Sequence, residues 1–252
     1  MNLGIDADPS HPRYNSLLSR HKLAEGAKKG MLADSALIAH GRGEAFDYLL
    51  GEQTIPSAQL ATQEASARLN SASHPIISLN GNVVALCGEE SLRLASKIGC
   101  PVEINIFYRT PERMAALLDY LIEINERLEL GVTILGQAPD AMIPGLEGPR
   151  AACHSEGIYS SDVILVPLED GDRCEALVAM GKDVIVIDLN PLSRSAKMAS
   201  VTIVDELSRV ISNLIEMQPN VRKPTDWNNE LCLQQAIDFI CESLSTGKQS
   251  AY

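Results

Sequence analysis

The sequence lacks the marks of several protein classes. It has no run of about eighteen apolar residues and no apolar stretch near its beginning, so neither a membrane span nor a secretion signal is expected. Basic residues are few: 21 Lys and Arg stand against 33 Asp and Glu, a formal net charge of −12, which disfavours nucleic acids and anionic membranes as partners. We therefore expect a cytoplasmic globular protein, in which locally concentrated arginines would hold any bound phosphate.

Metal-binding and common nucleotide-binding patterns are also missing. The six cysteines form no C-x-x-C pair and have no histidine at metal-ligand spacing: Cys87, Cys100, Cys153, Cys174, Cys232 and Cys241. Reduced, mostly buried thiols are favoured over a metal or catalytic role. Neither the G-x-x-x-x-G-K-[ST] phosphate loop nor the G-x-G-x-x-G dinucleotide fingerprint is present. Any nucleotide must therefore be bound by other residues.

Short apolar runs alternate with helical segments from residue 75 onward. The runs are mostly continuous and β-branched, which is typical of parallel strands covered on both faces: 75–79, 102–107, 132–135, 162–168, 183–189 and 201–204. Helices are predicted between several of them, at 110–128, 173–180 and 205–218. The alternation predicts an α/β fold with a doubly wound, mostly parallel, Rossmann-like sheet.

Both ends of the chain are predicted to be helical. Helices are expected at about 12–29, 44–50 and 57–70, and a final amphipathic helix is expected to end near Gly247. The chain is interpreted as a single α/β domain with three successive parts: a helical N-terminal segment at 10–72, a sheet core at 73–207 and C-terminal helices at 208–247.

Two regions allow more than one interpretation. Asn80-Gly81 is a hairpin signal, but a strand followed by a helix starting at Asn82 is preferred, because residues 89–97 continue as helix. The irregular region 136–161, rich in Gly, Pro and charge, is either a long active-site loop or a surface excursion.

The most informative segment is AHGRGEAFDYLLGE, residues 39–52, in which Arg42 lies between two glycines. A turn at Gly41 and Gly43 would let a phosphate approach both the backbone and the guanidinium. A helix starting near Glu44 would add its positive end. The alternative is a tight turn with a solvated arginine.

Polar residues follow the predicted strands, at the edge where open α/β sheets bind ligands. They are Asn80, Asn82, Arg109, Glu169, Asp170, Asp172, Arg173, Asp188, Asn190, Arg194, Ser195 and Asp205. Three strand-end arginines, together with Arg42, favour a phosphate-binding rim, whereas one alone would be interpreted as a surface salt bridge. The acidic residues either hold Mg²⁺ or a ribose hydroxyl, or balance the arginines in an empty site.

The motifs of the chain are similar, in order, to those of the archaeal 4-phosphopantoate–β-alanine ligases, also called phosphopantothenate synthetases. The matching motifs are SHPRYNSLLSR (10–20), AHGRGEAFDYLLGE (39–52), NGNVVAL (80–86), EINIFYRT (103–110), PGLE (144–147), VPLEDGDR (166–173) and IDLNPLSRSAKMA (187–199). The resemblance spans about residues 10–215. It implies a homodimeric, Rossmann-like enzyme of coenzyme A biosynthesis that joins (R)-4-phosphopantoate to β-alanine. In that reaction ATP is cleaved to AMP and pyrophosphate through an acyl-adenylate.

The same resemblance implies a set of ATP contacts. Carried onto matching positions, they are Arg20, Arg42, Asp188, Leu189, Asn190, Arg194, Ser195, Glu206 and Leu207. The chemistry agrees with an arginine-rich rim, because a carboxylate that attacks the α-phosphorus of ATP meets like-charge repulsion that cations must offset.

The remaining candidates are assigned to the acid and the amine. Arg109 and Arg173 are expected to be free for phosphopantoate or the β-alanine carboxylate, and Asn80 and Asn82 are expected to orient the acyl group. Further expected roles are Mg²⁺ binding by Asp170 or Asp172 and uptake of the amine proton by His40 or Glu44. A phosphotransferase for a small phosphorylated acid and a non-catalytic nucleotide- or metabolite-binding regulator are the alternative functions.

Overall fold

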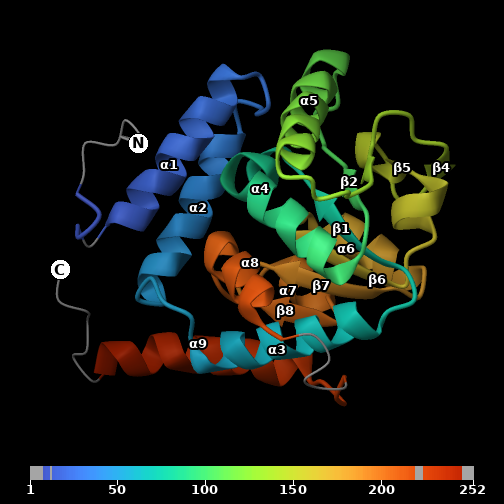
Figure 1. Cartoon of the computed structure of the whole chain (residues 1–252). Coiled ribbons are helices and arrows are strands. Elements are labelled where there is room, and N and C mark those ends of the chain that lie inside the picture. The colour runs from blue at the N-terminus through green and yellow to red at the C-terminus, as the bar shows by residue number, and fades with distance from the viewer. Residues whose placement is uncertain (1–7, 12, 219–223, 246–252) are drawn as a thin grey trace.

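The computed structural model describes residues 8–11, 13–218 and 224–245. In this part of the chain, six parallel strands form one sheet of order β3-β2-β1-β6-β7-β8, with a short antiparallel pair, β4 and β5, beside it (Figure 1). Because β1 lies inside the sheet and the two halves of the chain extend it in opposite directions, the predicted doubly wound, Rossmann-like fold is confirmed. None of the described helices has the length and hydrophobicity to cross a membrane.

The six strands of the main sheet lie within the predicted apolar runs, whereas β4 and β5 lie in the irregular region 136–161, where no strand is predicted. The strands are β1 Pro75–Leu79, β2 Val102–Ile104, β3 Ile134–Leu135, β4 Ala141–Met142, β5 Ala152–Cys153, β6 Val163–Pro167, β7 Asp183–Ile187 and β8 Val201–Ile203. β6 is buried throughout, and β1 and β7 are buried after their first residues. This burial explains why the runs are continuously apolar rather than alternating.

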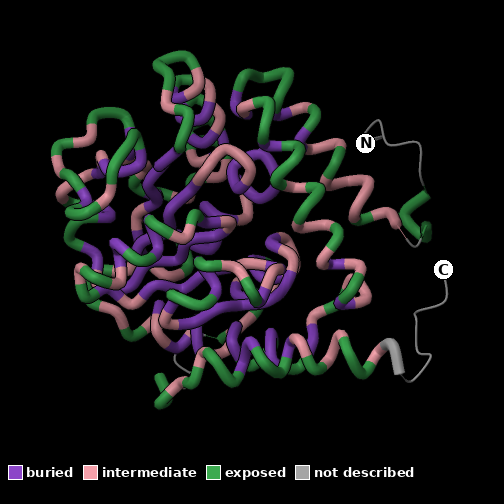
Figure 2. The backbone as a smooth tube through the Cα atoms, turned by 180° about the vertical axis from the view of Figure 1, so that it is seen from behind, coloured by how far each residue is buried: buried purple, intermediate pink, exposed green. Residues whose placement is uncertain are grey.

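Helices cover both faces of the sheet and the edge formed by β8. They are α1 Tyr14–Lys28, α2 Ala36–Leu49, α3 Pro56–Ser71, α4 Gly81–Ile98, α5 Pro111–Arg127, α6 Gly171–Ala179, α7 Arg194–Met198, α8 Leu207–Glu216 and α9 Asn229–Ser245. One core lies beneath α4, α5 and α8, and a second lies beneath α6 and the π-helical turn η2, Ser155–Tyr159. Buried residues are concentrated in these inner layers (Figure 2).

The helix starts follow local capping signals. Thr110 accepts a hydrogen bond from the Arg113 amide at 3.3 Å, and Pro111 occupies the first turn of α5, as predicted. Asn80 accepts from the Val83 amide at 3.1 Å, so the chain enters α4 at Gly81 and forms no hairpin. The predicted helix start at Pro12 and helix end at Gly247 lie outside the described residues.

The segment 39–52 differs from its prediction. α2 begins at Ala36, so Gly41, Arg42 and Gly43 lie inside a helix and not in a turn, and no helix N-terminus lies at Glu44. A Cβ added at Gly41 would meet nothing within 4 Å, and one added at Gly43 would make an ordinary 3.5 Å contact with Leu189. Neither glycine is required by the backbone, and each costs the helix about 1 kcal/mol relative to alanine.

Gly41→Ala is therefore expected to raise the free energy of unfolding by roughly 0.5–1 kcal/mol, measured by urea denaturation. Gly131→Ala is the matched control. Gly131 is equally free of neighbours, but its φ of +66° strains an alanine, so stability should fall there. A loss of stability at Gly41 would contradict the helical assignment.

Candidate active site

A cavity of about 920 Å³ opens at the carboxyl edge of the sheet. Its wall includes a residue that follows each of five strands: Asn80, Ile106, Leu168, Leu189 and Glu206. Residues of α1 and α2 contribute the opposite wall, so the N-terminal segment folds over this edge. Ligands of doubly wound sheets bind at this edge, and the volume suits small molecules.

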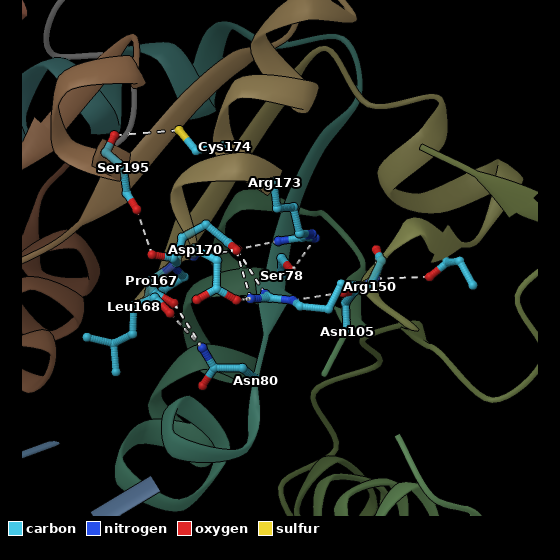
Figure 3. Close-up of polar contacts among 12 residues, drawn as sticks. Ser78, Asn80, Asn105, Arg150, Pro167, Leu168, Asp170, Arg173, Cys174 and Ser195 are labelled. Atoms are coloured by element: carbon cyan, nitrogen blue, oxygen red, sulfur yellow. Dashed lines mark hydrogen bonds and ion pairs between the residues drawn. The ribbon is translucent and has the colours of Figure 1, made fainter. Parts of the chain in front are cut away.

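The cavity spans the point where the strand order reverses, between β1 and β6. The side-chain amide of Asn80 bridges the two strands, donating to the carbonyl oxygens of Pro167 at 3.2 Å and Leu168 at 3.1 Å (Figure 3). Leu168 has a φ of +56°, a strained conformation for a residue other than glycine and one that clusters at functional sites. The sequence gives no indication that Leu168 adopts this conformation or lines the cavity. Asn82 also lines the cavity, and its side chain donates to the Ala36 carbonyl at 3.1 Å, which attaches α2 to α4.

α2 brings three predicted residues to the cavity. Arg42 is exposed and makes no hydrogen bond or ion pair with the described residues, and its charge acts on Asp188. Glu44 is held by Arg20, whose Nε and Nη2 donate to it at 2.9 and 2.7 Å. Burial raises the pKa of Glu44, but the bonds and charge of Arg20 more than offset this, so the pKa lies below its usual value. Glu44 is thus an ion-pair partner in the free protein.

His40 is the third of these residues. Its Nε2 is buried and has no partner among the described residues, and burial lowers the pKa of the imidazole below its usual 6.5. A neutral imidazole with an unused nitrogen is suited to accept a proton near pH 7.

His40→Gln is expected to weaken the dependence of stability on pH. The folded-state pKa is lowered, so the unfolded chain binds the proton more readily, and the wild type loses stability as the pH falls below 6.5. Glutamine binds no proton, so the variant should lose less stability than the wild type between pH 7.5 and 5.5 in urea unfolding. His74→Gln, at an exposed position away from the cavity, is the control. Equal pH slopes for wild type and His40→Gln would refute the prediction.

The predicted ATP residues near β7 and β8 divide into two groups. Leu189, Glu206 and Leu207 line the cavity. The others lie outside its wall: Asp188, Asn190, Arg194 and Ser195. Asp188 accepts from the Asn190 amide at 2.9 Å, and burial raises its pKa. Ser195 is buried and donates to the Glu169 carbonyl at 2.6 Å, whereas Arg194 is exposed and pairs with Glu175.

The two predicted substrate arginines differ in how far they are buried and paired. Arg173 is only 1% exposed and lies outside the cavity wall, because α6 begins at Gly171 and directs the side chain into the protein. It forms an ion pair with Glu169 and donates to Ser78 Oγ at 3.1 Å. Arg109 also lies outside the wall and donates to the Gly136 carbonyl. The expectation of a free guanidinium is wrong for the buried Arg173, whereas for the partly exposed Arg109 it stays a prediction.

Arg150 is a cavity arginine that sequence reasoning missed. It lies in the 3₁₀ turn η1, Pro149–Ala151, within the irregular region 136–161, and its side chain is 7% exposed. Its Nη1 lies 2.7 Å from Glu169 Oε1 and donates to Asp170 Oδ2 at 2.9 Å, and its Nε donates to Asn105 Oδ1 at 3.2 Å. Region 136–161 has no periodicity, so the sequence offered no signal for this placement. The region packs into the second core through buried side chains and so is more than a surface excursion.

The predicted metal ligands form no metal site of their own. Asp170 lines the cavity but pairs with Arg150, and Asp172 is exposed and outside the wall. Residues 8–11, 13–218 and 224–245 contain no group of three or more His, Cys, Asp or Glu placed to hold a metal. Five cysteines are buried and Cys241 is exposed, and burial raises the pKa of Cys87 and Cys100 to about 12, which keeps these thiols protonated.

Comparison with known proteins agrees with the geometry. The model of the phosphopantothenate/pantothenate synthetase family matches residues 57–242. A 4-phosphopantoate–β-alanine ligase of Thermococcus kodakarensis is 49% identical over 230 residues, covering 91% of this chain and 85% of that protein. One of Thermococcus onnurineus is 52% identical over 208 residues, covering 82% and 78%. One of Methanosarcina mazei is 44% identical over 250 residues, covering 96% of each. The resemblance drawn from the seven motifs is confirmed, and the chain belongs to the phosphopantothenate/pantothenate synthetase family.

Proposed function

We propose that this protein is an ATP-dependent ligase of coenzyme A biosynthesis that joins (R)-4-phosphopantoate to β-alanine. The products are 4′-phosphopantothenate, AMP and pyrophosphate. Family membership and relatives of the same name at 44–52% identity support the proposal. The observation that carries it is the cavity at the strand-order reversal, where one wall presents the unpaired Arg42 and the other presents Arg150.

The two halves of the sheet suggest a division of the substrates. ATP is assigned to the β7–β8 side, against Arg42, Leu189 and Glu206. The acid is assigned to the β1–β2 side, near Asn80 and Arg150, so that its carboxylate meets the α-phosphorus at the centre. Arg42 offsets the negative charge that gathers as these two groups approach.

The reaction then proceeds in two steps. A carboxylate oxygen bonds to the α-phosphorus while the bond to the pyrophosphate oxygen breaks, which gives the acyl-adenylate. The β-alanine nitrogen bonds to the acyl carbon, the amine proton passes to the neutral His40, and the bond from that carbon to the AMP oxygen breaks. His40 is preferred over Glu44 because Arg20 already engages the carboxylate.

Mg²⁺ is proposed as a companion of the ATP phosphates. Asp170 bonded to Arg150, and Asp172 outside the cavity, do not amount to a resident magnesium site. Nucleotide-bound Mg²⁺ keeps several waters and needs only one or two protein carboxylates.

We further propose that the protein is a cytoplasmic homodimer. α1 and α2 form a wall of the cavity, yet α2 leaves Leu37, Ile38 and Leu49 between 49% and 70% exposed. A second copy of the chain, which the family resemblance implies, would cover this apolar helix face. Sedimentation of the wild type and of Ile38→Asp tests this, and a monomeric wild type would refute it.

Arg42→Ala is expected to raise the KM for ATP or lower turnover at least tenfold. The reason is that loss of a guanidinium facing a bound phosphate costs about 2–5 kcal/mol. AMP formation at varied ATP measures this. Arg93→Ala, an exposed arginine that pairs with Glu89 away from the cavity, is the control. Because Arg42 has no bond to the described residues, the thermal stability of Arg42→Ala should equal that of the wild type. If Arg42→Ala has the same kinetics as the wild type, Arg42 does not belong to the site.

The function itself is tested with purified protein, ATP, Mg²⁺, 4-phosphopantoate and β-alanine, omitting each in turn. AMP formation that requires both acid and amine supports the ligase. ADP as the product would indicate a phosphotransferase. Nucleotide binding without turnover would indicate a regulator.

A further inference from the structure

We propose that Arg150 binds an oxyanion of the acid substrate, and that Asp170 occupies this position in the free protein as an internal competing anion. The inference rests on the proposed function, which supplies an acid that carries both a carboxylate and a phosphate. Through Arg150, region 136–161 takes part in substrate binding.

The position of Arg150 is determined by residues from three parts of the chain. η1 delivers the side chain to the carboxyl edge of the sheet, between Asn105, which follows β2, and Asp170, which follows β6. Asn80, at the end of the intervening strand β1, lies in the same group (Figure 3). The guanidinium therefore lies at the strand-order reversal, where the acid must present its carboxylate to ATP.

Arg150 pairs with two carboxylates, the enclosed Glu169 and the exposed Asp170. Arg150 and Arg173 share a single fully buried carboxylate, that of Glu169, whose side chain is 0% exposed. The more distant Glu103 also acts on Arg173, but its oxygens accept the amides of His154 and Ile158. Among the described residues, Asp170 is the carboxylate that pairs with Arg150 and with no other arginine.

Asp170 is a replaceable partner. Its side chain is 56% exposed and makes one contact with Arg150, whereas Glu169 is enclosed. Nε of Arg150 donates to Asn105, Nη2 donates to Glu169 and Nη1 donates to Asp170, and Nη1 also lies 2.7 Å from Glu169 Oε1. If Asp170 turns toward solvent, the Nη1 donor that it used becomes available to an incoming oxyanion without loss of the Glu169 pair.

This arrangement predicts competition between Asp170 and the substrate. An oxyanion in the cavity gains charge-assisted hydrogen bonds from a guanidinium that is already held in place. It must first displace a half-exposed ion pair, whose strength corresponds to about a threefold change in affinity. Removal of Asp170 should therefore tighten binding of the acid, and removal of Arg150 should weaken it.

The test measures the KM for the phosphorylated acid, at saturating ATP and β-alanine, in Arg150→Met, Asp170→Asn and the double variant. We expect Arg150→Met to raise this KM at least tenfold and Asp170→Asn to lower it about threefold, with the KM for ATP unchanged. In the double variant Asp170→Asn should have no effect, because there is no guanidinium left to compete for. Arg150→Met is expected to fold, because Glu169 still forms its ion pair with Arg173.

Glu147→Gln is the matched control, because it removes one exposed carboxylate from the same region without touching Arg150 or the cavity. Unphosphorylated pantoate, used as a competing inhibitor, identifies the group that Arg150 holds. If Arg150→Met weakens binding of the phosphorylated acid alone, Arg150 binds the phosphate. If it weakens binding of both acids equally, Arg150 binds the carboxylate.

A KM for the acid that is unchanged in both single variants would overturn the inference. So would an Asp170→Asn effect that persists without Arg150, or one that instead lowers kcat and raises the Mg²⁺ requirement. If the wild type forms no AMP that depends on the acid, the proposed function fails. In that case, calorimetric titration of the same variants with phosphopantoate measures whether Arg150 binds the carboxylate or phosphate of this acid.

Discussion

Glu169→Gln is expected to lower the free energy of unfolding by about 3–5 kcal/mol, because it leaves two buried guanidiniums without a shared anion. Glu169 pairs with Arg150 through Oε1 at 2.7 Å, and its Oε2 accepts from Arg150 at 2.9 Å and from Arg173. Arg173 is 1% exposed, so water cannot replace the lost carboxylate. Glutamine retains the shape but presents an amide N–H₂ group that repels a guanidinium.

Urea unfolding of the purified variants measures this effect. Glu89→Gln is the control, since Glu89 also pairs with two arginines, Arg93 and Arg127, but all three side chains are at least 35% exposed. Exposed pairs contribute about 0–1 kcal/mol each, so the control should remain close to the wild type. Equal losses for Glu169→Gln and Glu89→Gln would show that the buried charges are not coupled as described.

Gly157→Ala is expected to lower the free energy of unfolding by about 3 kcal/mol. An added Cβ would lie 2.2 Å from Glu103 Oε2 and 2.8 Å from Leu135 Cδ1. Glu103 is 1% exposed and is held by the amides of His154 at 3.0 Å and Ile158 at 2.8 Å, so it cannot move without breaking these bonds. Overpacking costs about 1–3 kcal/mol, and losing hydrogen bonds to a charged group adds a similar amount.

The Glu103→Ala background provides the decisive comparison. Truncation of Glu103 removes the nearest atom, so adding Gly157→Ala should cost less there than in the wild type. If Gly157→Ala lowers the free energy of unfolding equally in both backgrounds, the added Cβ does not clash with Glu103. Because region 136–161 also carries Arg150, we expect Gly157→Ala to raise the KM for the acid more than the KM for ATP.

The strands and most helices could be predicted because their signals are local. Buried parallel strands need continuous β-branched runs, and the run at 183–189 contains β7, whose residues after the first are all buried. Thr110 and Pro111 mark the start of α5 for reasons confined to one helical turn. α2 was misjudged for the opposite reason: its two glycines disfavour a helix locally, but contacts such as Asn82 with the Ala36 carbonyl stabilise it across the fold.

The sequence by itself determined the doubly wound sheet, the family, and the presence of Asn80 at the carboxyl edge, because these follow from residue pattern and strand direction. Only the tertiary structure decided which arginines face the cavity, Arg42 of α2 among them. Burial and pairing, which depend on residues far apart in the chain, place Arg173 with Glu169 beneath the site and bring Arg150 from an irregular region to the cavity wall. All arginines carry the same charge in the sequence, but burial and ion-pair partners decide which guanidiniums can bind a ligand.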